Sequence, residues 1–314
     1  MNLIEQAARR LEQLRQAGVE IPEYQGASAA AQGLLQPEAP MRSAPPAMSR
    51  IVDLDIDALA AKGLITPNAP RSFLADQYRV IKRPLIANAV ARGEAAVRHS
   101  NLIMVTSALS GEGKSFTSIN LAMSIAAELD HTVMLVDADV ARPSVLKVLG
   151  LDPAPGLLEV LEGKADLSST LLRTNIDKLT LLPSGTPHPK ATELLASESM
   201  AALLDDISTR YADRIVIFDS PPLLLTTESR VLASRMGQVV IVVQAGRTLQ
   251  ADVQNALAMI DSCPIRLMLL NKARAIGKDA YGYGYGYGYG YGYGYGYSEG
   301  SSPKNQPVAA ASKG

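Results

Sequence analysis

The stretch LIMVTSALSGEGKSFTSINLAMSIAAEL, residues 102–129, decides the fold of this chain. It begins with an aliphatic run of strand length, passes through a glycine-containing turn, and continues into a segment with helical periodicity. The turn, ALSGEGKS at 108–115, matches the phosphate-loop pattern, with Ala108 in place of the first Gly. Gly111 and Gly113 let the backbone direct its N–H groups around phosphate oxygens, and the helix that follows adds its positive N-terminus. A Gly-rich turn with a surface lysine is the competing interpretation, and the flanking strand and helix argue against it.

The rest of the chain alternates short aliphatic runs with segments of helical length. The runs occupy 102–106, 133–137, 179–183, 214–219, 238–243 and 265–270. Strands that are almost continuously aliphatic are buried on both faces, and strands that alternate with helices form parallel sheets. The sequence therefore predicts an α/β fold of the P-loop NTPase type. We expect a doubly wound, mostly parallel sheet flanked by helices, with its site at the carboxyl ends of the strands.

Two further strands end in acidic residues. VMLVD at 133–137 ends in Asp137 and is followed by Asp139, whereas RIVIFD ends in Asp219. Carboxylates at these strand ends lie beside the phosphate loop, where they can hold Mg²⁺ directly or through water. A helix N-cap at a strand-to-helix turn is the alternative role, and it applies best to Asp219 taken alone.

The phosphate loop and the last strand supply the predicted nucleotide contacts. Lys114 can reach the β- and γ-phosphates, and Ser115 can ligate Mg²⁺. Asn271, at the end of the last strand, either recognises an adenine edge or forms a turn. The residues predicted to bind the nucleotide are Ser110, Gly111, Glu112, Gly113, Lys114, Ser115, Phe116 and Asn271.

Composition and charge exclude several classes of protein. The 314 residues include 30 basic and 31 acidic side chains, so the net charge of −1 gives no sign of nucleic-acid binding. The chain has no apolar run near the roughly 18 residues that span a bilayer. The charged N-terminus is unlike a signal peptide. The single cysteine, Cys263, is expected to be a small buried apolar residue in a reducing compartment.

Three segments follow from composition: 1–50, 51–275 and 276–314. The first combines an amphipathic helix at 3–17 with a linker rich in Pro and Ala. The second is the α/β domain. Its N-terminal part is expected to contain a strand at 51–56, a helix at 56–63 that Gly63 closes, and a helix at 71–83 that Pro84 kinks or ends.

The third segment carries a tyrosine-glycine repeat. Nine of the twelve Tyr lie in 281–297 and alternate strictly with eight Gly. They are Tyr281, Tyr283, Tyr285, Tyr287, Tyr289, Tyr291, Tyr293, Tyr295 and Tyr297. Alternating Gly gives high backbone entropy, so we expect this tail to be disordered when free. It is interpreted either as a set of phosphate acceptors or as an adhesive low-complexity segment.

These motifs together resemble the bacterial tyrosine kinases that control exopolysaccharide and capsule production. The matching stretches are SALSGEGKS at 107–115, VDADVARP at 136–143, FDSPPLL at 218–224 and the Tyr-rich tail. The segment YRVIKRPLIANA at 78–89 and the repeat itself look like the exosortase-associated autokinases. The resemblance implies a protein-tyrosine autokinase that uses ATP and Mg²⁺.

Site roles follow from this resemblance. Lys114 and the loop amides would hold the ATP phosphates. Ser115, Asp139 and Asp219 would position Mg²⁺. Asp137 would lie near the acceptor hydroxyl and take its proton, although the division of base and metal roles between Asp137 and Asp139 stays open at this point.

The resemblance also implies an assembly. Members of the family form rings in which the tail of one subunit enters its neighbour's site, and a membrane-anchored chain-length determinant protein activates them. We therefore expect a separate membrane partner, a cognate tyrosine phosphatase, and a cytoplasmic location at the inner membrane, with residues 3–17 as a candidate docking helix. The family's oligomerisation motif ExxRxxR is replaced here by Asp76, Arg79 and Lys82, with Arg83 one place late. Lys82 stands where the motif has its second Arg, and a lysine cannot form the bidentate ion pair that an arginine forms with a carboxylate.

Two other functions remain open from the sequence. A partition-type switch ATPase would use the same kind of sheet, but such ATPases carry an additional Lys early in the phosphate loop, where this chain has Leu109. A nucleotide-dependent scaffold that displays adhesive tails is the third interpretation.

Overall fold

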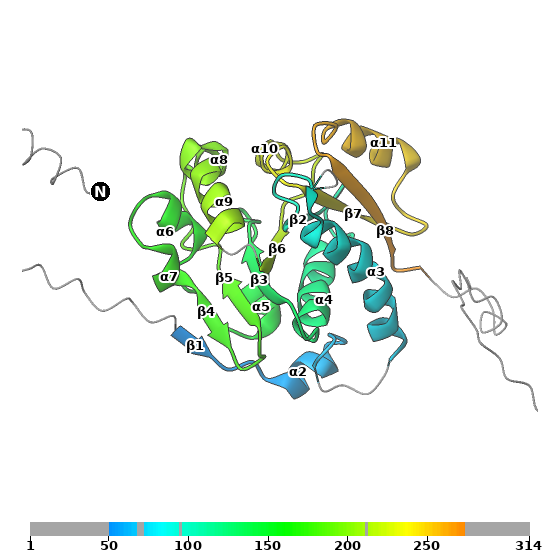
Figure 1. The fold of residues 1–314 in the computed structure, drawn as a ribbon. Coiled ribbons are helices and arrows are strands. Elements are labelled where there is room, and N and C mark those ends of the chain that lie inside the picture. The colour runs from blue at the N-terminus through cyan, green and yellow to red at the C-terminus, as the bar shows by residue number, and fades with distance from the viewer. Residues whose placement is uncertain (1–49, 68–71, 94–95, 211–212, 274–314) are drawn as a thin grey trace, which may run out of the picture.

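The computed structural model describes residues 50–67, 72–93, 96–210 and 213–273, which form the α/β domain (Figure 1). The predicted helix at 3–17, the linker apart from Arg50, and the tail from 276 onward lie outside the described residues.

The centre of the domain is an eight-stranded sheet with the order β1-β4-β5-β3-β6-β2-β7-β8. The strands are β1 (Arg50–Val52), β2 (Leu102–Ser107), β3 (Thr132–Asp137), β4 (Leu172–Thr174), β5 (Leu179–Leu182), β6 (Arg214–Asp219), β7 (Gln238–Gln244) and β8 (Ile265–Asn271). All neighbouring pairs run parallel except β4 and β5. The carboxyl ends of β2, β3 and β6 therefore meet at one edge of the sheet, which is where a doubly wound fold places its site.

Helices cover both faces of the sheet (Figure 1). They are α2 (Ile56–Ala61), α3 (Phe73–Val90), α4 (Lys114–Ala126), α5 (Val145–Leu149), α6 (Leu157–Leu161), α7 (Leu167–Thr170), α8 (Ala191–Ala196), α9 (Glu198–Arg210), α10 (Glu228–Ala233) and α11 (Gln250–Ala258). Helices α2 to α5 contribute to one apolar cluster, and α6 to α11 contribute to the other. Each face of the sheet thus has its own core layer.

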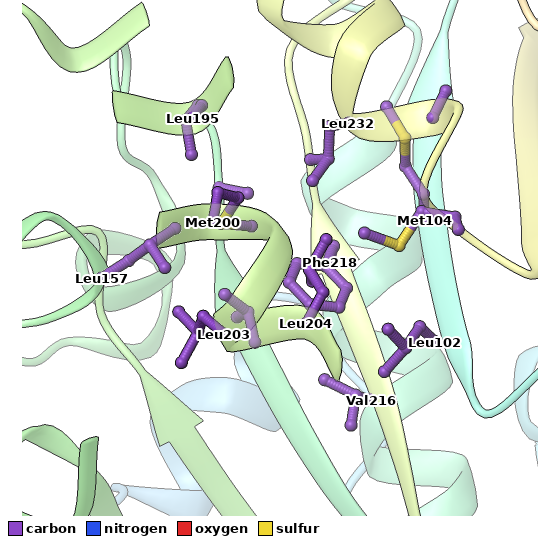
Figure 2. Packing of buried hydrophobic residues seen from close by; sticks show 14 of the residues in the cluster. Leu102, Met104, Leu157, Leu195, Met200, Leu203, Leu204, Val216, Phe218 and Leu232 are labelled. Carbon is purple, nitrogen blue, oxygen red and sulfur yellow. The ribbon is translucent and has the colours of Figure 1, made fainter. Parts of the chain in front are cut away.

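The two core layers are mainly aliphatic, as the composition requires, with Phe218 in one and Tyr78 in the other. Figure 2 shows part of the second layer, in which Met104 and Phe218 come from strands and Leu204 comes from α9. Phe218 and Met104 have no exposed surface. Burial of such a side chain stabilises the fold by roughly 1.5–3 kcal/mol, so this layer fixes β6 and β2 and with them the strand ends that form the site.

The predicted sheet is confirmed, with local differences. All six predicted strands of the α/β pattern form, and Cys263 is buried as expected. The strand predicted at 51–56 is shorter, because Asp55 leaves the strand and accepts a hydrogen bond from the Ala58 N–H as the N-cap of α2. The sequence does not predict the three-residue strand β4, because LRT is too short and polar to show a pattern.

Of the two outcomes predicted at Pro84, a kink or an end of the helix, the end is wrong. Helix α3 continues through Pro84 to Val90. Proline removes the N–H that would bond to the carbonyl of Val80. The Val80 side chain is 71% exposed, so this turn of the helix faces water, which can satisfy the freed carbonyl. None of the helices within the described residues is long and apolar enough to cross a bilayer.

Candidate functional site

The phosphate loop lies between β2 and α4, as the sequence predicts. Helix α4 begins at Lys114 with Gly113 as its N-cap in the left-handed region at φ 103°, and Gly111 has φ 83°. Gly adopts these values without the steric penalty that a Cβ brings. The helix N-terminus and the loop amides therefore face the same space, which suits them to bind phosphate.

A buried glutamate stabilises the shape of the loop. Glu112 accepts a hydrogen bond from the Leu109 N–H at 2.7 Å through Oε2, and its Oε1 accepts one from the Thr248 hydroxyl. Only 3% of Glu112 is exposed. Its carboxylate is thus engaged with the protein, and any contact of this residue with phosphate would come from its backbone.

The end of β8 holds the other side of the loop. Asn271 donates from Nδ2 to the Glu112 carbonyl at 2.9 Å, and Lys272 donates from Nζ to the Gly111 carbonyl at 2.7 Å. The Oδ1 of Asn271 accepts from the Lys272 N–H at 2.8 Å. Both polar ends of the Asn271 side chain therefore have partners in this structure. Recognition of adenine by Asn271 stays a prediction, and it would require these bonds to be exchanged.

Close packing at Gly113 predicts a large effect of a single methyl group. A Cβ built on Gly113 would lie 2.2 Å from Asn271 Nδ2, and the residue has a positive φ. We expect Gly113→Ala to lower the free energy of unfolding by about 2–4 kcal/mol, through strain and the displaced Asn271. Gly111→Ala is the matched control, because it shares the positive φ but has no atom within 4 Å of the added Cβ. Urea unfolding without nucleotide measures both, and equal losses would contradict the packing argument.

Lys114 and Asp139 form an ion pair at the mouth of the loop. Lys114 Nζ lies 3.6 Å from Asp139 Oδ2, and each side chain is 10% exposed. Asp139 Oδ1 also accepts from the Arg142 N–H at 3.2 Å. Burial raises the pKa of Asp139, and the Lys114 charge partly opposes this rise. The lysine is therefore positioned over the loop in a form that can exchange this carboxylate for phosphate oxygens.

Asp137 is more deeply buried than Asp139. Its Oδ2 accepts hydrogen bonds from the backbone N–H groups of Ser144 and Val145 at 3.0 and 2.9 Å. Its Oδ1 has no hydrogen-bond partner among the described residues. Burial, together with the negative charge of Asp219, raises the pKa of Asp137 to about 7. The carboxyl group can therefore gain or lose a proton near neutral pH.

Asp219 completes the group of acids from the end of β6. Its Oδ1 accepts from the Ser118 hydroxyl at 3.0 Å, and its Oδ2 has no hydrogen-bond partner in the described part of the chain. Burial raises its pKa to about 6, partly offset by the Ser115 hydroxyl and the Lys114 charge. Its main contact is thus a side chain of the phosphate-loop helix. As it caps no helix among the described residues, the N-cap alternative loses its support.

The donor set fits a magnesium ion. Mg²⁺ prefers oxygen ligands and is usually held by one or two carboxylates together with substrate phosphates. Asp137 and Asp219 each present a buried carboxylate oxygen without a partner in the described chain, and Ser115 presents a hydroxyl that accepts a hydrogen bond from Ser144 at 2.8 Å. No cluster of three or more His, Cys, Asp or Glu that could hold a metal occurs within the described ranges. The fit therefore depends on oxygens that the nucleotide would add.

The raised pKa values predict how stability changes with pH. A carboxyl group whose pKa is higher in the folded state than in the unfolded state stabilises the fold when protonated, and this contribution is lost as pH rises through the folded-state pKa. The folded-state pKa is about 7 for Asp137 and about 6 for Asp219, against an ordinary aspartate value of 3.8. We therefore expect the nucleotide-free protein to lose stability between about pH 4 and pH 7.

Asp137→Asn tests this dependence. The substitution removes one of these titrations, so the unfolding midpoint of the variant in urea should fall less than that of the wild type between about pH 5 and pH 8. Parallel profiles for the two proteins would contradict the assignment of the titration to Asp137.

The predicted oligomerisation residues lie on α3. Asp76 and Arg79 form an exposed ion pair with each other at 2.8 Å. Lys82 is 5% exposed and donates to the Ser124 carbonyl at the end of α4, and it pairs with Glu128 at 2.5 Å. Its ammonium group thus stabilises the C-terminal end of the phosphate-loop helix. Contacts between subunits through Asp76, Arg79, Lys82 and Arg83 stay a prediction.

The structure adds site residues that the sequence reasoning missed. Ser118 lies one helical turn after Lys114 and bonds to Asp219, so its spacing could have indicated it. Ser144 follows the acidic motif and contacts Ser115. No spacing in the sequence indicates Thr248 or Lys272, because they reach the loop from segments more than 130 residues away in the chain.

Comparisons with known proteins agree with this geometry. A protein-family profile described as an AAA domain matches residues 100–269. The chain is 31% identical over 224 residues to the tyrosine-protein kinase YwqD of Bacillus subtilis (strain 168), and this region is 71% of this chain and 91% of that protein. It is 34% identical over 156 residues to the tyrosine-protein kinase CpsD of Streptococcus pneumoniae serotype 4, with 49% of this chain and 67% of that protein covered.

Some relatives are much longer. The tyrosine-protein kinase wzc of Salmonella typhi is 31% identical over 188 residues, and this region is 59% of the present chain but only 26% of that protein. Among solved structures, the chimerical protein CapA2B2 matches with a TM-score of 0.55 and 25% identity over 71% of this chain and 93% of that one. The VpsO kinase domain matches with a TM-score of 0.53 and 26% identity over 64% and 96%.

Proposed function

Since this chain belongs to the bacterial tyrosine kinase family, we propose that it is an ATP- and Mg²⁺-dependent autokinase that phosphorylates tyrosines of its own segment 281–297. The observation that carries the proposal is the convergence of Lys114 with the carboxylates of Asp137, Asp139 and Asp219 beside the phosphate loop. A binding module needs the loop, whereas phosphoryl transfer also needs acids that can position a metal and accept a proton.

The proposed roles follow from the contacts of each residue. Lys114 exchanges Asp139 for the β- and γ-phosphate oxygens of ATP. Ser115 and Asp219 would hold Mg²⁺ together with Asp139, whose Oδ2 would become available once Lys114 leaves it for phosphate. The bound ion would neutralise phosphate charge. The Oδ1 of Asp137 has no partner among the described residues, and its pKa of about 7 is near the value that suits a general base at neutral pH.

In the transfer itself, the tyrosine oxygen forms a bond with the γ-phosphorus while the bond from that phosphorus to the bridging oxygen of ATP breaks. ADP leaves with the bonding electron pair. The hydroxyl proton of the tyrosine passes to Asp137. The reaction is therefore balanced by groups that this chain and ATP provide.

The tail has properties that suit a substrate. Its 17 residues at 281–297 span roughly 55–60 Å when extended, so it can reach the site of a neighbouring subunit in trans. The seven tyrosines from Tyr283 to Tyr295 have Gly on both sides, so each presents the same local sequence to the kinase. Each phosphate adds about −1.5 to −2 charges, and nine would add on the order of −14 to −18. We propose that this repulsion disperses a ring of subunits.

The subgroup, the partners and the location of this chain are proposed from its sequence motifs and its relatives. The repeat and YRVIKRPLIANA at 78–89 support membership of the exosortase-associated subgroup that regulates exopolysaccharide polymerisation and export. YwqD and CpsD are matched over most of their own length, which supports a separate membrane-anchored chain-length determinant as the activating partner. A cognate tyrosine phosphatase and a position at the cytoplasmic face of the inner membrane belong to the same proposal.

The test is to incubate the purified chain with ATP and Mg²⁺ and to map modified residues by intact and peptide mass spectrometry. A cytoplasmic fragment of the membrane partner is included in a parallel reaction. Serial additions of one phosphate within 281–297 support the autokinase. Release of inorganic phosphate without a modified tail supports a partition-type ATPase instead, and neither product in either reaction supports a scaffold.

A further inference from the structure

Strand β8 forms an edge of the sheet that nothing in the described part of the chain covers. It lies at the end of the strand order, next to β7 on one side only. Its residues 267–270 are Leu-Met-Leu-Leu, and Met268 and Leu270 are 63% and 65% exposed. Long apolar edge strands are open to pairing with other chains, and natural proteins usually cover or charge them.

The backbone of β8 has hydrogen-bonding groups turned outward. The Asn271 carbonyl accepts from the Ala245 N–H at 2.9 Å, so the backbone groups of Asn271 face β7. Successive residues of a strand turn their N–H and C=O groups to opposite sides. The groups of Arg266, Met268 and Leu270 therefore point to the free edge, where they are available to another strand.

An apolar groove runs along this edge. A cavity of about 550 Å³ lies between α3 and β8. Its lining includes Leu74, Tyr78, Ile81, Pro84, Leu267 and Leu269. In Figure 1, α3 and β8 lie beside each other on the side of the molecule where the described chain ends. A strand added to β8 would thus place alternate side chains against α3.

We propose that the tyrosine-glycine repeat at 281–297 docks as an additional strand on the edge of β8, with its tyrosine rings in the groove under α3. The chain leaves the described structure at Ala273, two residues after β8 ends. The seven residues 274–280 then connect the strand to the repeat, a length sufficient for a hairpin that returns antiparallel along the same edge.

The repeat has the period that an added strand requires. Side chains of a strand alternate between its two faces, so strict Tyr-Gly alternation puts every tyrosine on one face and every glycine on the other. Tyrosine favours strands and buries a large ring, whereas the glycine face needs no room. A seven-residue piece such as 281–287 matches the seven residues of β8 and carries four Tyr.

The repeat also lets the docked strand change its register on β8. A shift by two residues restores the same pattern, so many registers are equivalent and different tyrosines occupy the groove in turn. Glycine in a strand lowers its stability through backbone entropy, so the docked state is weak. Such an element can release its tyrosines without a large barrier.

Position in the chain favours this occupant over others. The segment 3–17 is joined to the opposite edge of the sheet, and its apolar residues recur at helical spacing, which does not suit an added strand. A second copy would pair through the same edge only at high protein concentration, whereas the tail is tethered beside it.

Docking would hold the tyrosines in a groove whose lining also includes Phe116 and Asn271, two residues predicted to bind the nucleotide. Once modified, a phosphotyrosine carries up to two charges that an apolar groove cannot accommodate, so it would not return. This consequence depends on the proposed kinase function, whereas the docking itself does not.

The test is residue-specific amide hydrogen exchange in the full chain, treated with a tyrosine phosphatase and kept free of nucleotide. We expect the N–H groups of Met268 and Leu270 to exchange at least about tenfold more slowly than in a chain whose 281–297 residues keep their composition but lose the alternation. A tenfold difference in exchange rate corresponds to a docking free energy of about 1.4 kcal/mol. Dilution should leave the native protection unchanged.

Two edge variants separate docking from side-chain effects. Met268→Pro removes an edge-facing N–H without breaking a bond to β7, so the Leu270 N–H should lose its protection. Met268→Ala retains the N–H and should keep that protection. Equal exchange in the native and rearranged tails overturns the proposal, whether both are fast or both are slow. Protection that disappears on dilution also overturns it, and identifies a second copy as the occupant.

Discussion

Replacing Lys114 by methionine should abolish phosphate incorporation into 281–297. The Lys114 Nζ lies 3.6 Å from Asp139 Oδ2, among the buried acids and in the position where the phosphate loop binds its ligand. Loss of one preorganised charge that stabilises a transition state typically lowers the rate by about 10²–10³, and this lysine also contributes to ATP binding. We therefore expect a fall of about 10³ or more in the rate of tail phosphorylation, measured by intact mass.

A surface lysine provides the control for this substitution. Lys147 lies exposed on α5, and Lys147→Met makes the same chemical change outside the site. Its rate should equal that of the wild type. Circular dichroism should show that Lys114→Met remains folded. If Lys114→Met keeps more than about a tenth of the rate, the proposed site is not where the phosphate is transferred.

Asp219→Asn should inactivate the enzyme and stabilise the nucleotide-free protein at the same time. The carboxylate is fully buried and its pKa is raised to about 6, so its ionised form is unfavourable in the fold at neutral pH. Removing the charge should increase the free energy of unfolding by on the order of 1–3 kcal/mol at about pH 8. The activity should fall by about 10²–10⁴, because the proposed oxygen ligand is lost.

The predicted gain in stability and loss of activity distinguish a ligand role of Asp219 from a structural one. A residue that only supports the fold would lose stability and activity together. Urea unfolding and tail phosphorylation are measured on the same preparation. Asp177→Asn changes an exposed carboxylate and should alter neither quantity. A destabilised Asp219→Asn protein, or an active one, would contradict the proposed role of Asp219.

Much of the fold and part of the site can be predicted from the chain alone. The strands of the central sheet are aliphatic runs, and parallel strands that end in Asp137 and Asp219 must bring these acids to one edge. Their convergence with Lys114 results from the position of the phosphate loop after β2. The sequence is sufficient to place these three residues because each lies at the end of an aliphatic strand or in the phosphate loop.

Other features depend on contacts that no local pattern reveals. Glu112 meets Thr248 across 136 positions of sequence, and Lys272 meets Gly111 across 161. The inward direction of Lys82 depends on where α4 ends, since its partner is the Ser124 carbonyl. The continuation of α3 past Pro84 depends on the exposure of that turn. These are properties of tertiary packing, which the spacing of residues along one helix does not determine.

The most direct measurement is a complementation between two inactive chains. One chain carries Lys114→Met with its tail intact, and the other has a wild-type site with all nine tail Tyr changed to Phe. Neither should modify its own tail. When they are mixed with ATP and Mg²⁺, phosphate should appear on tyrosines within 281–297 of the Lys114→Met chain, as peptide mass spectrometry would show. Release of inorganic phosphate from ATP with that tail unmodified would contradict the conclusion that this site acts on the tail of another subunit.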